Sequence, residues 1–565
     1  MVINVKPTQR INSLKPLYAA PVLSMPKIEG VAVQGAELAN IDGLRGVLAT
    51  KNIAANNPIV EVDGDLVLQV TNNREGSPFP SFCSQSVWNT LKWDERLAMK
   101  LLHLKFSSKS EDRALQGWVS DLPQRFSTPF DWNENELKEL QYEALYTKVQ
   151  SQRDKWRASY ALCFPSSSSA SAVSFEEFCW ALQCVNSRAF SGPYEGSNAS
   201  ERRRLLAFTG FLTAVWPLLH LGTYEQSLSA AFIVTASIFI RDVISLRVAK
   251  LKRYVICPVV DMFNHRSDAV SDASCNYFTG RFQLFTGEYS PGEQIFVSYG
   301  KQSNDRLLQY YGFVEPSNPH DVYDFNYGFI DLLFKYADDL AKYVDFPVLP
   351  DVKTRLQIIS AALQNTMIQN ADDNPNAAGS RELISAIDFN CRYFRTVPIE
   401  RRPISLKEGT EEVSVTKDDL LLHYDDVTVR AMRAFLCSPA EWELKMSDKE
   451  DSFTLRGLEV PMSMETEQKL VCALRKVAAL ELSSKATTLE DDMAAISIRK
   501  DSSLQTTSLG FESKKIKKGV AEQKARKGAI FESPDPSGIY RDRVYSATIF
   551  RMEKKGLLAH AADRN

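Results

Sequence analysis

Two apolar, β-rich runs that end in polar or phenolic side chains constrain the fold of this chain most strongly. Both runs lie between residues 254 and 318. The first ends in Asp261, Asn264 and His265, and the second ends in Tyr299. Because side chains at strand ends converge on crevices, these residues predict a small-molecule site. For each residue taken singly, a turn after a strand or a core aromatic is the alternative.

An amphipathic segment closes this stretch on Tyr311, Gly312 and Phe313. The series PVVDMFNH, PGEQIFVSYG and YYGF resembles the second half of a SET domain, in the branch that contains the Rubisco large-subunit lysine methyltransferase. Members of this family are protein methyltransferases that use S-adenosylmethionine. The resemblance implies that Asn264 and His265 bind this cofactor.

Length and composition limit the classes of protein to consider. At 565 residues the chain is too long for one hydrophobic core, which predicts two or three domains. Its net charge of -3 argues against a dominant nucleic-acid role, because phosphate binding leaves a basic footprint. None of the nine cysteines lies in a C-x-x-C pair, so we expect no zinc site and no other metal. Their odd number fits a reducing compartment.

Residues 1–29 carry four basic residues and no acidic residue before Glu29. This composition is that of a flexible N-terminus or an organelle transit segment, and the apolar core of a secretory signal is missing from it. We therefore expect a protein of the cytoplasm or of the chloroplast stroma.

The catalytic domain is expected at 30–318, and it opens with short predicted strands separated by turns. Gly43, Leu44 and Arg45 lie between two of these strands. Glycine lets the backbone approach a ligand closely, although a glycine hairpin without a ligand is the alternative. The segment resembles the opening of the SET domain, where this loop cradles the methionine end of the cofactor. The resemblance thus implies that these three residues bind the cofactor.

Helical periodicity predicts an insert at about 81–173, broken at Pro123 and Pro129. It resembles the helical insert that splits the SET domain in this branch. Ser174 and Glu177 then form a capping-box pattern, which predicts that the next helix begins there.

Arg188 and Phe190 belong to the sequence SRAF at the end of that helix, which resembles a signature of the family. An arginine at this point could pair bidentately with the cofactor carboxylate, or it could cap the C-terminus of the helix. The resemblance implies a cofactor contact for Arg188. It also implies substrate contacts for Phe190, Asp261 and Tyr311.

An apolar helical insertion at about 191–250 is explained least by the family resemblance. Its two uncharged runs contain 17 and 13 residues, at or below the roughly 17 to 25 residues that span a bilayer. Pro217 also interrupts the first run. We therefore predict a buried helical hairpin against the catalytic core, and no transmembrane span. Peripheral membrane contact through 205–240, beside three arginines, is the alternative.

Residues 319–565 are expected to form an all-helical domain with a basic linker near 493–538. Helical patterns cover 426–436 and 465–482. The region resembles the C-terminal domain that positions protein substrates in this family. The expected fold is α+β: a β-rich SET domain split by a helical insert, followed by an all-helical substrate-binding domain.

Methyl transfer from a sulfonium to an amine mainly requires aligned reactants, an effect worth up to roughly 7 to 11 kcal/mol. It also requires a neutral amine, and a lysine pKa near about 10.4 leaves about one molecule in a thousand neutral at about pH 7.4. The hydroxyl of Tyr299 can orient the lone pair of the amine, which makes Tyr299 the predicted catalytic residue. Phe190 and Tyr311 can wall the channel.

We predict a monomeric protein-lysine N-methyltransferase that acts on a non-histone protein. In the histidine methyltransferase of the family, an asparagine replaces the phenylalanine of SRAF and the final tyrosine is absent, whereas Phe190 and Tyr311 are present here. A catalytically silent scaffold that binds a protein partner is the competing class. The joint presence of Tyr299, His265 and Arg188 favours the enzyme.

Overall fold

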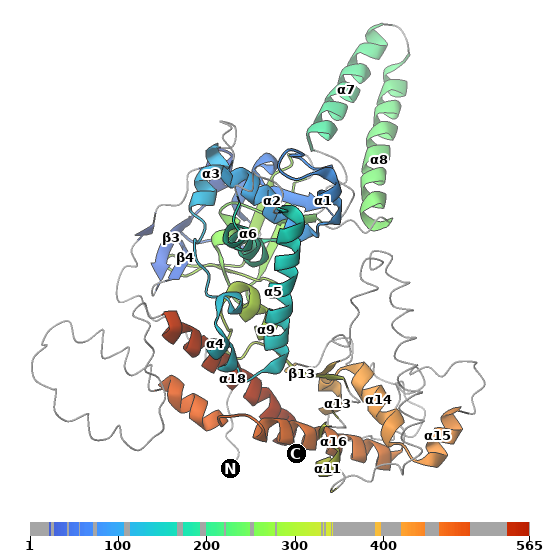
Figure 1. Ribbon diagram of the computed structural model, residues 1–565. Coiled ribbons are helices and arrows are strands. Elements are labelled where there is room, and N and C mark those ends of the chain that lie inside the picture. The colour runs from blue at the N-terminus through green and yellow to red at the C-terminus, as the bar shows by residue number, and fades with distance from the viewer. Residues whose placement is uncertain are drawn as a thin grey trace, which may run out of the picture. The chain divides into compact units, whose positions relative to one another are not determined.

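The computed structural model describes residues 22–23, 28–41, 44–55, 57–71, 76–106, 113–165, 173–192, 199–219, 222–248, 253–276, 279–328, 332, 335–340, 342, 390–396, 420–446, 463–497 and 539–563. The chain divides into two compact units, which contain both helices and strands (Figure 1). The first comprises 1–126 and 153–301, and the second comprises 127–152 and 302–565. The domain limits expected from the sequence stay predictions.

Short strands make up the β structure of the first unit. Within the described residues they form two three-stranded sheets, one four-stranded sheet and one parallel pair. In sheet order they are β1 (Val22–Leu23), β3 (Ala36–Ile41) and β4 (Leu44–Ala49); β10 (Ser271–Cys275), β11 (Phe282–Thr286), β5 (Pro58–Val62) and β2 (Val31–Val33); β6 (Leu68–Thr71), β8 (Arg253–Ile256) and β7 (Phe190–Gly192); and β12 (Phe296–Val297) with β9 (Asn264–His265). Alternate residues of β11 are buried, so one face of the four-stranded sheet packs on the core.

Helices of the insert and the helix that follows it surround these sheets. They are α1 (Gln85–Thr90), α2 (Trp93–Phe106), α3 (Arg113–Ser120), α5 (Glu143–Cys163), whose residues belong partly to each unit, and α6 (Phe175–Arg188). The predicted start of α6 is confirmed: the hydroxyl of Ser174 accepts from the backbone N–H of Glu177 at 3.2 Å, and the carboxylate of Glu177 accepts from the N–H of Ser174 at 3.0 Å. α2 packs against α6 and β6.

Two long helices, α7 (Ala199–Leu218) and α8 (Tyr224–Val248), pack against each other as a hairpin (Figure 1). Their large apolar side chains are exposed, for example Phe211 at 62% and Phe232 at 75%. The prediction that these side chains lie buried against the catalytic core is therefore wrong. The two helices pack against each other and leave these side chains outside.

The second unit contains most of the helices after residue 301. Its elements are η3 (Pro129–Asp131), α4 (Glu134–Lys138), α9 (Asn304–Arg306), η5 (Leu307–Tyr311), β13 (Val322–Gly328), α11 (Ala337–Leu340), β14 (Asn390–Phe394), α13 (Leu420–His423), α14 (Asp426–Leu436), α15 (Pro439–Met446), α16 (Met464–Ser483) and α18 (Ile539–Asp563). The predicted helix at 426–436 is confirmed as α14, and the one at 465–482 as α16. The basic linker expected near 493–538 lies outside the described residues from 498 onward.

The expectation that this region is all-helical is wrong, because β13 and β14 pair as antiparallel strands. Tyr323 and Phe325 of β13 are buried, as are Cys391 and Tyr393 of β14. In β14 buried and partly buried side chains alternate, and period-two burial is typical of strands. In β13 the carboxylate of Asp324, between the two aromatic residues, is buried as well. The aromatic rings of Tyr323 and Phe325 join the core between α16, α14 and α18.

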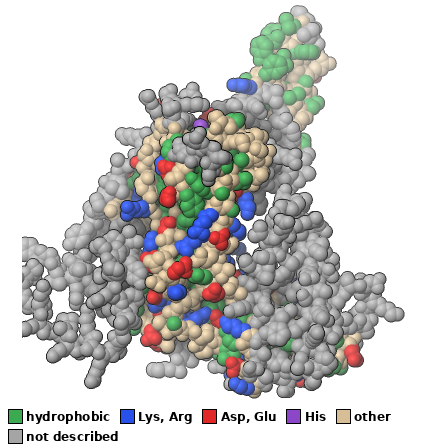
Figure 2. Space-filling view, in the orientation of Figure 1, with side chains coloured by type: hydrophobic (Ala, Val, Ile, Leu, Met, Phe, Trp, Pro, Cys, Tyr) green, Lys and Arg blue, Asp and Glu red, His purple; other side chains and the backbone are tan. Residues whose placement is uncertain are grey.

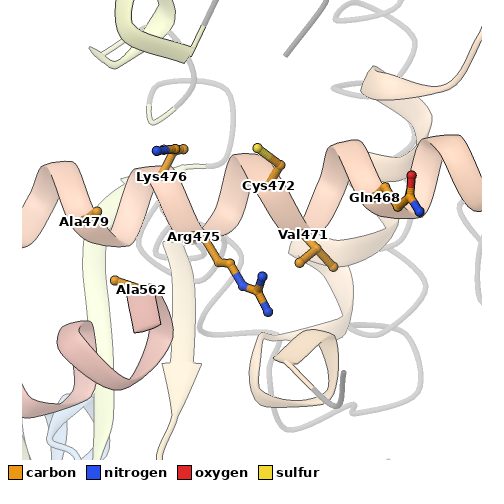
Figure 3. Close-up of a pocket in the computed structure, with 7 residues that line it drawn as sticks. All are labelled: Gln468, Val471, Cys472, Arg475, Lys476, Ala479 and Ala562. Carbon is orange, nitrogen blue, oxygen red and sulfur yellow. The ribbon is translucent and has the colours of Figure 1, made fainter. Parts of the chain in front are cut away.

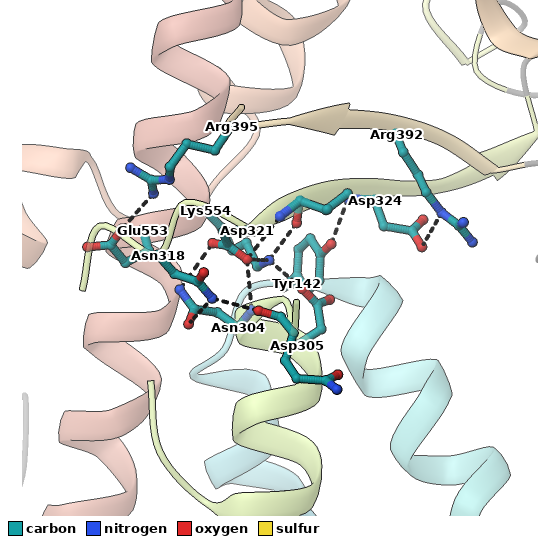
Figure 4. Close-up of polar contacts among 12 residues, drawn as sticks. Tyr142, Asn304, Asp305, Asn318, Asp321, Asp324, Arg392, Arg395, Glu553 and Lys554 are labelled. Carbon is teal, nitrogen blue, oxygen red and sulfur yellow. Dashed lines mark hydrogen bonds and ion pairs between the residues drawn. The ribbon is translucent and has the colours of Figure 1, made fainter. Parts of the chain in front are cut away.

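A buried ion cluster ties α18 to other elements of the second unit (Figure 4). The ammonium of Lys554 donates to Asp321 at 2.8 Å and to the carbonyl of Val322 at 2.6 Å, and it also contacts the carboxylate of Asp305. Burial by itself lowers the pKa of Lys554, but the two carboxylates raise it by more than burial lowers it, so its pKa lies above the ordinary value. Lys554 is therefore a charged, fully paired core residue.

None of the helices in the described ranges combines the length and the apolar character that crossing a membrane requires.

Candidate active site

The two strand ends singled out by the sequence meet in the first unit. β9 and β12 pair in parallel, with Asn264 opposite Phe296 and His265 opposite Val297. Tyr299 follows β12 by two residues, so its backbone lies beside His265. The structure thus brings Asn264, His265 and Tyr299 together, as the sequence predicts.

The imidazole of His265 is held in one tautomer by this arrangement. The backbone N–H of Tyr299 donates to Nδ1 of His265 at 3.0 Å, so that nitrogen carries no proton. The proton of the neutral ring then lies on Nε2. The carbonyl of Val297, 3.3 Å from Nδ1, consequently accepts no hydrogen bond from it. The rings of His265 and Tyr299 stack with centroids 4.9 Å apart, which fixes the plane of the phenol.

The hydroxyl of Tyr299 donates its proton to the backbone carbonyl of Phe263 at 2.7 Å. A hydroxyl has one proton and two lone pairs. Because the proton is directed at Phe263, the lone pairs of Tyr299 are oriented to accept a hydrogen bond from an approaching N–H group. This geometry suits a residue that orients an amine.

Asn264 connects this group to β4. Its side-chain amide donates to the carbonyl of Arg45 at 2.9 Å. The next residue, Gly46, has no room for a side chain, because a Cβ there would lie 2.7 Å from the Gln294 amide and 3.2 Å from that of Asn264. Glycine at 46 therefore lets the strand approach the site closely. Gly43 lies outside the described residues, and of Leu44 the structure describes only the backbone.

A buried ion pair lies in the same unit. The guanidinium Nε of Arg188 is 3.3 Å from Oδ2 of Asp261, and the two side chains are 10% and 0% exposed. The indole N–H of Trp118 donates to Oδ1 of Asp261 at 3.4 Å, and the ring of Phe126 lies 5.7 Å from the guanidinium carbon. Neither Nε of Arg188 nor Oδ2 of Asp261 makes a hydrogen bond to another described residue. The pair is thus buried but loosely bound.

Burial raises the pKa of Asp261, and the cations Arg188 and Arg45 oppose this rise. Burial also lowers the pKa of Arg45, and the nearby Asp261 opposes that shift. Asp121 also acts on Arg45, so the two guanidinium groups meet two carboxylates here. Either guanidinium has the geometry to pair with an anionic group of a ligand.

A strained backbone turn leads into the site. Val259 has φ 71° and ψ -43° and is fully buried. A β-branched residue rarely adopts positive φ, and such outliers are typical of functional sites. The turn reverses the chain between β8 and the 3₁₀ turn η4 (Val260–Met262), which carries Asp261.

Two buried thiols lie near Asp261, and neither is reactive. Burial raises the pKa of Cys184 to about 12, and burial raises the pKa of Cys257 well above its ordinary value. A thiol acts as a nucleophile only as the thiolate. The chemistry of this site therefore uses no cysteine nucleophile at either position.

The two predicted aromatic residues lie in different units. Phe190 begins β7, where it pairs with Val255 of β8, and it is half-buried. Tyr311 ends η5, a π-helical turn of the second unit, and burial raises the pKa of its phenol. The turn ends at Gly312, whose φ of 79° suits glycine. π-Helical turns are frequent at functional sites.

A cavity of about 470 Å³ opens along α16 in the second unit (Figure 3). Among the described residues it is lined by Gln468, Val471, Cys472, Arg475, Lys476, Ala479 and Ala562. Six of these lie on α16 and the last lies on α18. The lining is apolar with two basic side chains and no carboxylate.

Comparison with known proteins gives one consistent result. No protein-family model matches the chain. It is 31% identical over 91 residues to SET domain-containing protein 4 of Homo sapiens, across 16% of this chain and 20% of that one. It is 21% identical over 469 residues to the actin-histidine N-methyltransferase of Canis lupus familiaris, across 77% of this chain and 67% of that one. The solved SET domain of LSMT bound to lysine and AdoHcy matches with a TM-score of 0.50 and 16% identity, over 94% of this chain and 87% of that one.

The chain has a SET-domain fold. The resemblance to SET-domain methyltransferases and the mixture of helix and sheet are confirmed. The match to the human relative spans about a fifth of that protein's length. The division into a split SET domain and a substrate-binding domain stays a prediction.

Three residues of this SET domain contribute to the site and were missed from the sequence. Trp118 lies on α3, 143 residues before the Asp261 that it contacts. Phe263 contributes its backbone carbonyl, which no side-chain pattern reports. Val259 contributes a backbone conformation that its own residue type disfavours. The only clue in the sequence was that the indole of Trp118 has an N–H that needs a hydrogen-bond acceptor. Many tryptophans in protein cores share this property, so it does not identify a site.

Proposed function

We propose that this protein is an S-adenosylmethionine-dependent protein-lysine N-methyltransferase that acts on a non-histone protein. The hydrogen bond from the Tyr299 hydroxyl to the Phe263 carbonyl is the observation that carries the proposal. It directs the phenol oxygen lone pairs toward an N–H donor, as a methyl-accepting amine requires. The neighbouring His265, in its Nε2–H tautomer, holds the tyrosine backbone and stacks on its ring.

The residues present fit the cofactor. Its methionine end carries both a carboxylate and an ammonium group, and the site offers Arg45 and Arg188 for the first and Asp261 for the second. Nε of Arg188 and Oδ2 of Asp261 have hydrogen-bonding capacity left over from their own pair. Asn264, linked to the carbonyl of Arg45, would hold the cofactor from the side of β9. When bound, S-adenosylmethionine supplies a methyl group activated by its sulfonium charge.

The residues of the chain prepare the acceptor. A lysine must lose a proton before its nitrogen can attack, and burial disfavours the charged ammonium. The Tyr299 oxygen would accept one N–H of the neutral amine and aim the nitrogen lone pair. Phe190 would line the acceptor channel with an aromatic face that excludes water, and the substrate contact expected for Tyr311 stays a prediction.

Lysine is proposed over histidine as the acceptor. The actin-histidine N-methyltransferase of Canis lupus familiaris shares 21% identity with this chain, so histidine is the second candidate. Phe190 and Tyr311 favour lysine, because a histidine acceptor in this family goes with an asparagine at the first position and no tyrosine at the second.

The second unit is proposed to bind the protein substrate. Its basic cavity on α16, with Arg475 and Lys476, would attract acidic residues of that substrate. We further propose a monomer of the cytoplasm or chloroplast stroma. A catalytically silent scaffold is the competing function, and the oriented hydroxyl of Tyr299 favours the enzyme.

The test is methyl transfer. The purified full-length protein is incubated with labelled S-adenosylmethionine and a cell extract, and labelled proteins are hydrolysed to identify the modified amino acid. Methyl-lysine is expected, whereas methyl-histidine would select the second acceptor. Absence of any labelled protein, although the cofactor binds in calorimetry, would select the scaffold.

Tyr299→Phe tests the catalytic role with one atom removed. It should lower the methyl-transfer rate about 10- to 100-fold, while cofactor affinity and thermal unfolding stay near wild type. Tyr160→Phe is the matched control, because the Tyr160 hydroxyl also donates to a backbone carbonyl, that of Val173, at 3.0 Å. Equal rates for the two variants would contradict the assignment of Tyr299.

A further inference from the structure

We propose that the α7–α8 hairpin is a membrane-docking element that embeds in one leaflet of an anionic lipid bilayer. This surface lies outside the methyl-transfer site, and the proposal does not depend on the identity of the acceptor residue. Three features of the two helices carry it: which residues face outward, how the hydroxyl groups are satisfied, and how charge is distributed along the hairpin.

The outward-facing side chains are large and apolar. Figure 2 shows hydrophobic side chains gathered on the surface of this hairpin. They are exposed by 40% to 75% and comprise Phe208, Phe211, Leu212, Trp216, Leu218, Leu219, Tyr224, Leu228, Phe232, Ile233, Val234, Phe239 and Ile240. Monomeric proteins in water rarely expose a contiguous apolar patch of this kind. The patch therefore has a partner with an apolar surface.

The aromatic side chains of the hairpin are exposed instead of packed between the helices. Ser227 is buried at 6% exposure, and the partly buried side chains are those of Leu206, Thr209, Thr213, Val215, Pro217, Ala231 and Ala236. A hairpin that is stable in water places its large apolar residues between the helices. The exposure of every described aromatic side chain of α7 and α8 therefore favours an apolar surrounding for the hairpin.

Two hydroxyl groups on these helices are satisfied within their own helix, whereas the buried Oγ of Ser227 makes no hydrogen bond to another described residue. Thr213 donates to the carbonyl of Thr209 at 2.7 Å, and Ser237 donates to the carbonyl of Ile233 at 2.7 Å. Both bonds run from residue i to i−4. Such internal bonds matter most in lipid, because no water is present there to accept the proton. The hydroxyls of Thr213 and Ser237 are thus compatible with an apolar environment.

Basic charge is confined to one end of the hairpin. Residues 205–240 contain no lysine or arginine, and their one acidic residue, Glu225, lies in the first turn of α8 at the other end. Arginines 202, 203 and 204 lie near the N-terminus of α7, and Arg241 and Arg247 lie near the C-terminus of α8. They outnumber the two acidic residues beside them, Glu201 and Asp242. Because the two helices pair as a hairpin, both groups of arginines belong to the same end. An apolar body with a cationic end matches an apolar leaflet below anionic headgroups.

A second copy of the chain accounts for less of this pattern. It would cover the apolar faces, but it would not require a cationic end. A bilayer with anionic headgroups accounts for both features. The experiment below separates the two partners.

The test is flotation of the full-length protein with vesicles of phosphatidylcholine and phosphatidylserine. Most of the protein is expected to float, and Phe211→Glu with Phe232→Glu should lower the floated fraction at least about fivefold. Both side chains are exposed, at 62% and 75%, so the double variant should fold and keep its methyl-transfer activity. Val270→Glu is the matched control, because Val270 is an apolar residue 72% exposed outside the hairpin and its replacement should change nothing.

Trp216 supplies a spectroscopic readout. Its emission, taken as the difference between wild type and Trp216→Phe, should shift to the blue and be quenched by brominated lipid. Failure of the wild type to float, or flotation that the double variant does not reduce, would overturn the proposal. A lipid-free dimer that the same double variant dissociates would also overturn it and identify a second copy as the partner.

Discussion

Two buried ion clusters in this molecule differ in how completely the cation of each is paired. In the second unit, Lys554 donates to Asp321, Asp305 and a backbone carbonyl, and its pKa is raised. In the first unit, Arg188 and Asp261 approach to 3.3 Å. Neither Nε of Arg188 nor Oδ2 of Asp261 makes a hydrogen bond to another described residue, and burial raises the pKa of Asp261. All three donors of the Lys554 ammonium are paired, although Oδ1 of Asp305 makes no hydrogen bond to another described residue. We call the Lys554 cluster closed because its cation is fully paired, and the Arg188–Asp261 pair open because Nε of Arg188 is not.

This difference separates structural charge from functional charge. Desolvation of an ion is costly, so a cluster that only stabilises the fold should pair every donor of its buried cation internally. A cluster that receives a ligand must keep some of that capacity for the ligand. The open pair of Arg188 and Asp261 is therefore where we expect a charged group to bind, and the closed cluster of Lys554 is where we expect none.

The largest effect should come from breaking the closed cluster. Lys554→Met leaves Asp305 and Asp321 buried without their cation, so the free energy of unfolding should fall by about 3 to 5 kcal/mol. Denaturant unfolding of the full-length protein measures it. Lys342→Met is the control, because the Lys342–Asp339 pair is exposed on both sides and its loss should cost about 0.5 kcal/mol or less. Similar losses in the two variants would mean that closure of the cluster contributes nothing.

A smaller effect should follow acidification of another closed carboxylate, Glu481. Burial by itself raises its pKa, but Lys485, Lys335 and the hydroxyl of Tyr336 lower it by more than burial raises it. The net result is a pKa lowered from 4.5 to about 2. Since the folded pKa lies below the unfolded one, the stabilisation is complete above about pH 4.5 and is lost as the pH falls toward about 2. This shift corresponds to about 3 kcal/mol.

Glu481→Gln tests this pH dependence. Urea unfolding between neutral pH and about pH 3 should show a steeper loss of stability for wild type than for the variant. Glu465→Gln provides the comparison, because Glu465 is 74% exposed and pairs only with Lys469 one turn away. If wild type and Glu481→Gln lose stability in parallel, Glu481 is not held in its ionised form by the fold.

The smallest effect on stability should come from the open cluster. Asp261→Asn keeps an oxygen that can accept a hydrogen bond from Trp118, and it removes a charge that burial already disfavours. The free energy of unfolding should therefore fall by only about 1 to 2 kcal/mol. The free energy of cofactor binding should fall by more than the free energy of unfolding, because the variant lacks the charge that would pair with the ammonium group of the cofactor. Calorimetry with S-adenosylmethionine measures the affinity. A variant that binds the cofactor normally but unfolds as readily as Lys554→Met would show that Asp261 is structural.

Local patterns in the sequence predicted several features because their causes lie within a few residues. The capping box of Ser174 and Glu177 defines the start of α6, and the period of the apolar residues defines α14 at 426–436. The grouping of Asn264, His265 and Tyr299 followed from two strands that end in polar groups. Short-range hydrogen bonds and side-chain periodicity determine such features, so sequence alone contains them.

The sequence by itself thus determined the SET-domain resemblance, the starts of individual helices and the residues at the two strand ends. The tertiary structure decided which distant groups meet: Trp118 with Asp261, Lys554 with Asp305 and Asp321, and β13 with β14. It also decided that the large apolar side chains of α7 and α8 face outward. The physical reason is that burial and charge pairing depend on all elements packed around a residue, and apolar composition states only that a partner is needed.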